Sequence, residues 1–427
     1  MKRIWTGLSA AIVLGAALTA PPAAAEQVTL QVLHAWPSHK RFHEPIAEAF
    51  MKAHPDIRIE FQAPAASYGD AHQRIVRAAM TDTLPDVYYA AYNTLPELVR
   101  TLQPRGQIEP LNGLLQAEGT DWIAANYSPT VLALGQVDGQ QWGLPFNAST
   151  PIVYFNRDLI AKAGGNPDAF PADWDGIIGL ARKIKTSSDA DGMSYAVDEW
   201  GDDWLWQALV DNFGGRVIDP QTQKVAFGGE AGRKAVELAR RFVAETDMPF
   251  LNEDQAIQQF AAGKLGIFIG STAEVLSMGD AIGGKFKFGT APYPVADKAK
   301  GGLPTGGNAA VILTQDPAKR KAAWEFLKFV TGPEGQTIAV LGSGYMPTNL
   351  QVTKPEYLGD HYAKNPDWTT SMKQWPIARS WAGYPGNKSV GIWDEQKAIL
   401  SAIMRGSVTP EEGLAQLVAT TDTILTN

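Results

Sequence analysis

Short segments with strand character alternate with helical segments at the start of this chain. Residues 28–33 alternate in polarity and include β-branched side chains, which indicates a strand, and residues 57–61 have the same character. The intervening residues 40–54 carry apolar side chains at helical spacing. A second helix over residues 68–80 leads to a third strand over residues 87–91. This alternation predicts βαβ units, and therefore an α/β fold with mostly parallel sheets.

The same alternation continues further along the chain. Strands are expected at residues 142–145, 152–156, 265–269, 286–292 and 309–313. Helices are expected at residues 95–102, 159–163, 174–184, 204–213, 230–245, 254–262 and 317–331, followed by a C-terminal region of helices and loops. Gly332-Pro333 is expected to end the last of these helices. A chain of 427 residues exceeds the usual size of a single core, so more than one core is expected.

The first 25 residues have the layout of a secretory signal peptide. Lys2 and Arg3 are basic, residues 8–18 are mostly apolar and residues 23–25 are all alanine, which predicts cleavage after Ala25. The apolar run is shorter than the roughly 20 residues that a membrane-spanning helix needs. A retained membrane anchor is the alternative, and the length and flanking residues disfavour it. The mature protein is therefore expected in the periplasm.

The composition excludes several classes of function. Without Lys2 and Arg3 the chain has 35 basic and 45 acidic residues, a net charge of −10, which disfavours nucleic acids and anionic membranes as partners. The absence of cysteine removes disulfides, thiol chemistry and lipid attachment through a thioether. His39 and His43 are one helical turn apart, but no further ligand pattern accompanies them. No metal site and no cofactor are expected.

Several short motifs occur in a familiar order along the chain. They are PDVY at 85–88, YFNRDL at 154–159, FAAGKLGIFIG at 260–270, AWEFLKF at 323–329, GPEGQ at 332–336 and GYMP at 344–347. Each motif is weak alone, but the order is specific. The sequence resembles the extracellular solute-binding proteins that serve sugar-type ABC importers, the maltose-binding class. Through residues 344–347 and the C-terminal helices, it is most similar to the branch that binds glycerol 3-phosphate.

The resemblance implies an α/β, two-lobed periplasmic binding protein fold with a ligand cleft between the lobes and hinge crossovers. Family topology divides the chain into a signal peptide (1–25), an N-terminal lobe (26–148 plus 293–345) and a C-terminal lobe (149–292 plus 346–427). Hinge closure of such lobes buries a ligand and signals its presence. The implied protein is a monomer without catalysis. It delivers a carbohydrate or polyol-type solute, or an anionic glycerol or sugar derivative, to ABC transporter permease subunits in the inner membrane.

Candidate ligand residues follow the first three strands, because ligands of parallel α/β lobes meet the loops at strand ends. His34 and Trp36 follow the first strand and offer a polar ring and a stacking indole; a surface His and a packed Trp are the alternative. Ser67 and Tyr68 follow the second strand, although Tyr68 also suits a helix start. Asn93 follows the third strand, where the resemblance implies a ligand-binding carboxylate in the maltose binders.

The densest cluster of polar and aromatic residues is Asp202, Asp203, Trp204 and Trp206. A sugar places its C–H face on an indole and its hydroxyls on fixed acceptors, so Asp203 and Trp204 are expected to bind the ligand. The alternative is that residues 204–213 form a core helix whose start the aspartates cap.

Two further pairs and the segment between the lobes complete the polar candidates. Asn147 and Ser149 lie in the expected crossover Asn147–Thr150, where the resemblance implies a glutamate. The pairs Ser271-Thr272 and Gly306-Gly307 are expected to offer free backbone N–H groups to hydroxyls or to an anion. Turn glycines are the alternative for the second pair.

A late aromatic stretch supplies the last candidates. Tyr345, Arg379 and Tyr384 are expected at the ligand, among the neighbouring residues Trp375, Trp381 and Asn387. The glycerol 3-phosphate branch uses an arginine whose position is filled here by Tyr384. Arg379 is the candidate to replace it, with a surface role as the alternative. This departure argues against a phosphate ligand.

The sequence favours a binding protein over a secreted carbohydrate-active hydrolase, which is the rival function. Such a hydrolase needs two carboxylates about 5–10 Å apart across the bond that it cuts. Asp202 and Asp203 are adjacent, and the sequence marks no other acidic pair. We therefore expect a hydroxyl-rich ligand stacked on Trp36 or Trp204.

Overall fold

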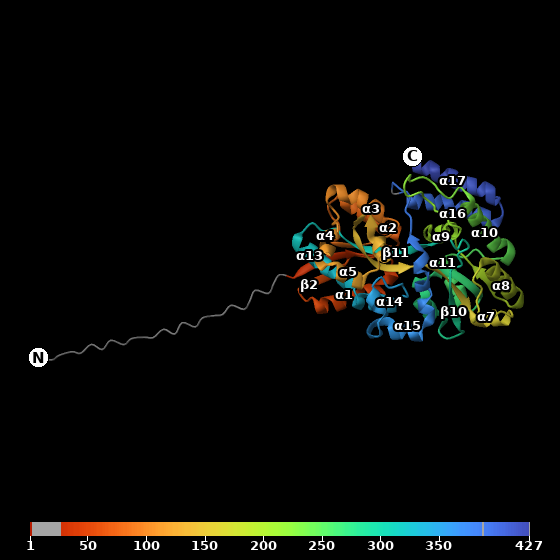
Figure 1. The fold of residues 1–427 in the computed structure, drawn as a ribbon, viewed down its shortest axis with the longest axis horizontal. Coiled ribbons are helices and arrows are strands. Elements are labelled where there is room, and N and C mark those ends of the chain that lie inside the picture. The colour runs from red at the N-terminus through yellow and green to blue at the C-terminus, as the bar shows by residue number, and fades with distance from the viewer. Residues whose placement is uncertain (2–26, 387, 427) are drawn as a thin grey trace.

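The computed structural model has two lobes that lie side by side, with β11 between them (Figure 1). It describes Met1 and residues 27–386 and 388–426. The expected signal peptide and Asn387 lie outside the described residues.

The first lobe is built on a six-stranded sheet with the strand order β12-β11-β3-β1-β2, in which β6 also pairs with β11. Its strands are β1 (Val28–Leu33), β2 (Ile57–Phe61), β3 (Val87–Ala91), β6 (Gly143–Ser149), β11 (Leu303–Ile312) and β12 (Ala378–Ser380). The second lobe is built on the order β10-β7-β9-β8. These strands are β7 (Pro151–Asn156), β8 (Asp191–Ser194), β9 (Leu265–Ser271) and β10 (Phe288–Pro292); a separate small pair is β4 (Gln136–Val137) with β5 (Gln140–Gln141).

The sheets are mixed, so the expectation of mostly parallel sheets was wrong. β1 pairs in parallel with β2 and β3, as the βαβ pattern predicts. β11 is antiparallel to both β3 and β6, and β7 is antiparallel to both β9 and β10. The reason is that β6 carries the chain out of the first sheet and β11 brings it back, so these neighbours run in opposite directions, and the same holds for β7 and β10 in the second sheet.

Seventeen α-helices cover the two sheets within the described part of the chain. The first group is α1 (Lys40–Ala53), α2 (Tyr68–Met80), α3 (Leu95–Leu102), α4 (Asn112–Glu118), α5 (Thr120–Asn126), α6 (Pro129–Leu132), α7 (Arg157–Lys162), α8 (Trp174–Ser187) and α9 (Trp204–Asn212). The second group is α10 (Glu230–Thr246), α11 (Glu253–Ala261), α12 (Val275–Ile282), α13 (Pro317–Val330), α14 (Pro333–Leu341), α15 (Asp360–Lys364), α16 (Ser389–Arg405) and α17 (Pro410–Thr426). Short 3₁₀ or π turns connect several of them.

Local sequence explains where several of these helices begin and end. Ser67 caps α2 by accepting a hydrogen bond from the Asp70 amide at 3.1 Å. Gly332-Pro333 ends α13 as expected, and Pro333 also begins α14, because proline suits the first position of a helix. That second role was missed in the sequence.

The chain passes between the lobes by three segments. Ser149 ends β6 and Pro151 begins β7, so the expected crossover Asn147–Thr150 joins the two sheets. The chain returns between β10 and β11, and residues 346–380 connect α14 to β12. Residues 350–359 pack against α14, and β12 pairs with β11. The lobe boundaries at this last crossing therefore stay a proposal.

Apolar side chains from both lobes pack into large buried clusters. One cluster lies between α1, α13 and the first sheet and includes Phe42, Phe50 and Phe326. Another runs from α2 through α9 to α16 and includes Trp204 and Trp206. Among the described residues, none of the helices combines the length and apolarity of a membrane span.

Candidate ligand-binding site

A cavity of about 290 Å³ opens where strand-end loops of the first lobe face helix starts of the second. Its lining includes four aromatic rings, four carboxylates and several small polar groups. The lining residues are Trp36, Ser67, Tyr68, Gly69, Asp70, Gln73, Asn93, Thr94, Gly201, Asp202, Asp203, Trp381, Ser389, Val390, Trp393 and Asp394. We refer to this space as the ligand cavity.

Trp36 and Tyr68 form the aromatic wall on the first lobe. Trp36 has a left-handed backbone conformation with φ 63°, which is costly for a residue with a side chain. A hydrogen bond of 2.8 Å from its amide to the carbonyl of Ala65 holds that conformation. The indole meets the Tyr68 ring edge-on at 5.8 Å between centroids. This hydrogen bond thus helps to hold the indole at the cavity wall.

Tyr68 is fixed by its neighbours on the first sheet. Its hydroxyl accepts a hydrogen bond from the side-chain amide of Asn308 at 3.3 Å. Burial raises the pKa of this hydroxyl, and hydrogen bonds from Asn308 and Tyr345 partly offset that effect. The backbone amide of Asn308 donates to the side-chain oxygen of Asn147 at 3.0 Å. Asn147 and Tyr345, both predicted at the ligand, therefore support Tyr68 from behind.

Asn93 lines the cavity and carries a buried polar atom without a partner in the described part of the chain. The residue is 9% exposed, and its side-chain oxygen has no hydrogen-bond partner among the described residues. A buried amide without a partner loses about 1–3 kcal/mol of hydration. A ligand hydroxyl or amine that bonds to Asn93 would restore this interaction.

Asp202 and Asp203 stand at the start of α9 on the opposite side of the cavity. Asp203 accepts hydrogen bonds from the Gln207 amide at 2.8 Å and from the Trp381 indole at 3.1 Å. Asp202 accepts one from the Trp204 amide at 3.1 Å. Burial, and then the neighbouring charge of Asp203, raise the pKa of Asp202 to about 7. Burial raises the pKa of Asp203 to about 6, although the hydrogen bonds from Gln207 and Trp381 act to lower it.

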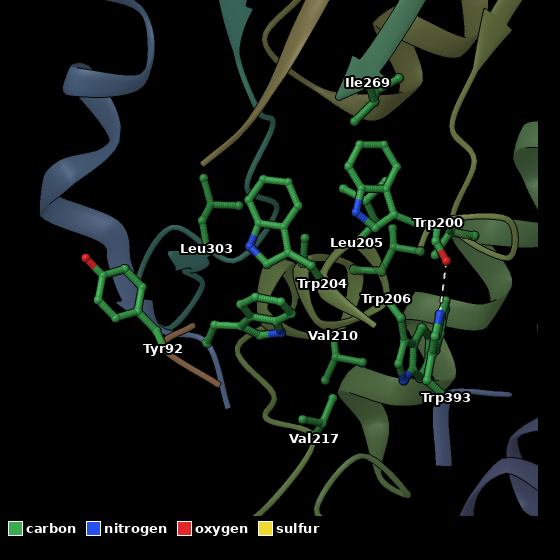
Figure 2. Close-up of a cluster of buried hydrophobic side chains, with 14 of the residues drawn as sticks. Tyr92, Trp200, Trp204, Leu205, Trp206, Val210, Val217, Ile269, Leu303 and Trp393 are labelled. Carbon is green, nitrogen blue, oxygen red and sulfur yellow. Dashed lines mark hydrogen bonds between the residues drawn. The ribbon is translucent and has the colours of Figure 1, made fainter. Parts of the chain in front are cut away.

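Two indoles complete the second-lobe wall. Trp381 is 3% exposed, and its ring lies edge-on to Tyr68 at 6.5 Å. Trp393 on α16 donates from its indole nitrogen to the carbonyl of Trp200 at 3.0 Å, the bond drawn in Figure 2. Ser389 and Trp393 were missed in the sequence, because nothing there marks the start of α16 as a neighbour of α2. The only feature of the sequence that could have marked these two residues as part of the site is their position shortly after the aromatic stretch.

Trp204 lies outside the lining of the ligand cavity, although the sequence favoured it for stacking. It is 4% exposed and packs in the apolar cluster with Leu205 and Leu303 (Figure 2). Its indole nitrogen donates to the carbonyl of Pro304 at 2.9 Å. His34 is also buried, and its ring stacks on His43 at 4.2 Å between centroids. Trp204 and His34 are therefore buried packing residues outside the lining of the ligand cavity.

The glycine pair does not offer the free amides that the sequence predicted. Gly306 and Gly307 lie inside β11, opposite Ser149 and Ala148 of β6. A side chain at Gly306 would meet the Trp204 indole and the Ser149 hydroxyl, so these glycines permit close packing. Ser149 is 4% exposed within the same pairing.

Ser271 and Thr272 are likewise occupied. The Ser271 carbonyl accepts from the Tyr154 hydroxyl at 2.6 Å, and its own hydroxyl accepts from the Ala273 amide at 3.1 Å. The Thr272 amide donates to the carbonyl of Thr150 at 3.2 Å. Both residues brace the crossover, outside the lining of the ligand cavity.

Arg379 and Tyr384 are held away from the ligand cavity by other partners. The Arg379 guanidinium donates to the carbonyl of Lys300 and lies 3.8 Å from the Asp211 carboxylate. The Tyr384 hydroxyl accepts from Gln396 at 3.2 Å, and its ring borders a space of about 30 Å³ beside the cavity. In the described residues, no Lys, Arg or His lines the ligand cavity.

Sequence comparison finds relatives among periplasmic binding proteins. The sn-glycerol-3-phosphate-binding periplasmic protein UgpB of Rhizobium meliloti (strain 1021) is 28% identical over 63% of this chain and 64% of its own length. The chain thus spans less than two thirds of that relative. A putative binding protein of Brucella abortus (strain 2308) is 26% identical over 90% of each chain.

Solved structures share the two-lobed fold. The cyclic alpha-maltosyl-1,6-maltose binding protein from Arthrobacter globiformis superposes with a TM-score of 0.77 at 20% identity, covering 93% of this chain and 99% of that one. UgpB from Mycobacterium tuberculosis, solved with glycerophosphocholine, gives 0.77 at 19% identity and covers 94% and 99%. The family model for bacterial extracellular solute-binding proteins matches residues 36–337, more than half of the chain. This chain therefore belongs to the bacterial extracellular solute-binding protein family.

Proposed function

We propose that this protein is the periplasmic substrate-binding component of an ABC importer for a small carbohydrate or polyol-type solute. The main support is the pairing of indole rings with fixed hydrogen-bonding groups in one cavity between the lobes. Aromatic rings take the C–H faces of such a solute, and Asn93, Asp202 and Asp203 take its hydroxyls. A space of about 290 Å³ suits a small solute rather than a long oligosaccharide.

The proposed mechanism is capture by closure of the two lobes. Solute in the cavity contacts Trp36 and Asn93 on one lobe and Asp203 and Trp381 on the other, so binding favours the closed arrangement. A permease in the inner membrane then recognises the closed form. The signal peptide, with cleavage after Ala25, brings the protein to the periplasm as a monomer in this proposal.

Hydrolysis of the solute is not part of the proposed function. Glycoside hydrolysis uses two carboxylates on either side of the scissile bond. Asp202 and Asp203 are consecutive residues at one helix start, and Asp203 is already bound to Gln207 and Trp381. They are placed to accept hydrogen bonds rather than to act from opposite faces of a sugar.

A thermal-shift screen of the mature chain against sugars and polyols tests this function. A ligand that binds only the folded state raises the melting temperature. We expect one chemical class to do so, and mass spectrometry after prolonged incubation to return that ligand intact. No shift across the panel would contradict solute capture, and recovery of a cleaved product would favour the hydrolase.

A further inference from the structure

The charge of the ligand cavity is one-sided. Four carboxylates line it, and no cationic side chain does so in the described residues. Asp70 is neutralised by Arg74 at 2.7 Å, and Asp394 by Lys397 at 2.8 Å. Asp202 and Asp203 are different, because among the described residues neither forms an ion pair.

Only neutral donors meet the two unpaired carboxylates. Asp203 receives bonds from Gln207 and Trp381, and Asp202 receives one from a backbone amide. Hydrogen bonds of this kind orient a carboxylate but leave its charge uncompensated. Removing such a charge from water is costly unless a cation arrives.

Two further acids, Glu253 on α11 and Glu274 before α12, lie outside the lining of the cavity, and Asp202 acts on the first of them. Burial, and then the charges of Glu274 and Asp202, raise the pKa of Glu253 to about 8. Burial also raises the pKa of Glu274, although the hydrogen bond from Ser277 acts to lower it. The charge of Asp202 thus disfavours ionisation of a neighbouring acid on a second element.

Aromatic rings enclose the unpaired carboxylates. Trp36, Tyr68 and Trp381 meet edge to face in a chain, with centroids 5.8 Å and 6.5 Å apart. Trp381 also bonds directly to Asp203. Ring faces attract cations through their quadrupole, most strongly where water is excluded.

From these contacts we infer that the natural solute carries a cationic amino or quaternary ammonium group, which lies between the Asp202–Asp203 pair and the aromatic rings. This inference rests on the proposed function and specifies its ligand class. The hydroxyl-bearing part of the solute then faces Asn93, Ser67 and the start of α2. A phosphate alone lacks a cationic partner in this lining.

Matched probes that differ in charge test the inference. Calorimetric titrations at pH 7.5 compare choline with its neutral isostere 3,3-dimethyl-1-butanol, and glucamine with sorbitol. We expect each cationic probe to bind at least about tenfold more tightly than its neutral partner, the size of a cation–π contact joined to a carboxylate. Added salt should reduce the difference.

The variant Asp202→Asn identifies the source of the preference. An asparagine oxygen can still accept the bond from the Trp204 amide, so the start of α9 is retained. We expect the cationic preference to fall below about threefold in this variant. Glu395→Gln is the matched control, because it removes one negative charge from an exposed position of α16 next to Asp394, outside the lining. It should keep the preference.

The possible outcomes separate the inference from the function beneath it. Binding of sorbitol as tight as that of glucamine, or failure of both cationic probes to bind at millimolar concentration, overturns the cationic ligand. In either case a neutral sugar that raises the melting temperature keeps solute capture intact. A preference that persists in Asp202→Asn also overturns the proposed contact.

Discussion

At the scale of single residues, Asp202 carries a half-buried carboxylate that has no cationic partner among the described residues. Its pKa rises from the ordinary 3.8 to about 7 because burial and Asp203 both disfavour the charge. Above pH 7 the folded protein therefore holds an ion that the unfolded chain hydrates better. As the pH falls from 7 toward 3.8, the native state takes up this proton first, and the destabilisation disappears.

Asp202→Asn should consequently stabilise the ligand-free protein in alkaline solution. The expected gain at pH 8 is about 2 kcal/mol, less than the full shift implies because the cavity admits water. It should shrink to a small fraction of this by about pH 4, where the wild-type carboxyl is protonated in the native state and partly protonated in the unfolded chain. Urea unfolding at both pH values measures it. An equal effect of the substitution at pH 8 and pH 4 would contradict the charged Asp202.

Trp36→Ala should weaken binding of whichever solute the screen identifies. Truncating an aromatic anchor costs on the order of 2 kcal/mol, or about thirtyfold in affinity. Trp122→Ala on α5 is the control, since this partly buried indole lies outside the ligand cavity. Calorimetry in which both variants bind like the wild type would remove Trp36 from the site.

At the scale of elements, sequence patterns predicted the helices and strands much better than the neighbours of each side chain. The strands and helices of the βαβ units follow from local periodicity, and Trp36, Tyr68 and Asn93 follow from their place after strands. Burial of Trp204 depends on Leu303, about a hundred residues away, and local sequence does not report such a contact. The same reason explains why the Gly306-Gly307 pairing with β6 was missed.

Helix α1 presents its buried histidine to the first sheet, which makes the lobe sensitive to acid. His43 is 1% exposed among Phe42, Tyr89 and Phe146, and burial lowers its pKa well below 6.5. The unfolded chain therefore binds this proton first as the pH falls. Stability should decline below about pH 6.5, where the unfolded state becomes protonated and the native state does not.

His43→Phe should flatten that decline, because it keeps an apolar ring and removes the titrating group. We expect the loss of stability between pH 6.5 and 5 to be smaller than in the wild type by about 1 kcal/mol. His54→Gln, at the other end of α1, controls for the removal of a histidine. Identical pH profiles for wild type and His43→Phe in urea unfolding would refute this role.

At the scale of the whole molecule, contacts between the lobes control closure. Arg41 on α1 lies 4.0 Å from Asp280 on α12, so an exposed ion pair spans the two lobes. Such a pair contributes less than about 1 kcal/mol. This ion pair therefore contributes little to holding the lobes together.

Solute should therefore change the shape of the protein in solution. We expect small-angle scattering of the mature chain to give a smaller radius of gyration when solute saturates the site, because the lobes approach around their hinge. At the same solute concentration, the radius of gyration of the Trp36→Ala variant should decrease less than that of the wild type. A profile that stays the same while calorimetry reports full binding would argue against closure.

A crystal structure of the mature chain with its bound solute tests the ligand cavity most directly. We predict solute density between Trp36 and Trp381, a hydrogen bond to the side-chain amide of Asn93, and a cationic group beside Asp202 and Asp203. Density for the solute elsewhere on the protein, with this cavity holding only water, would contradict the assignment of the site.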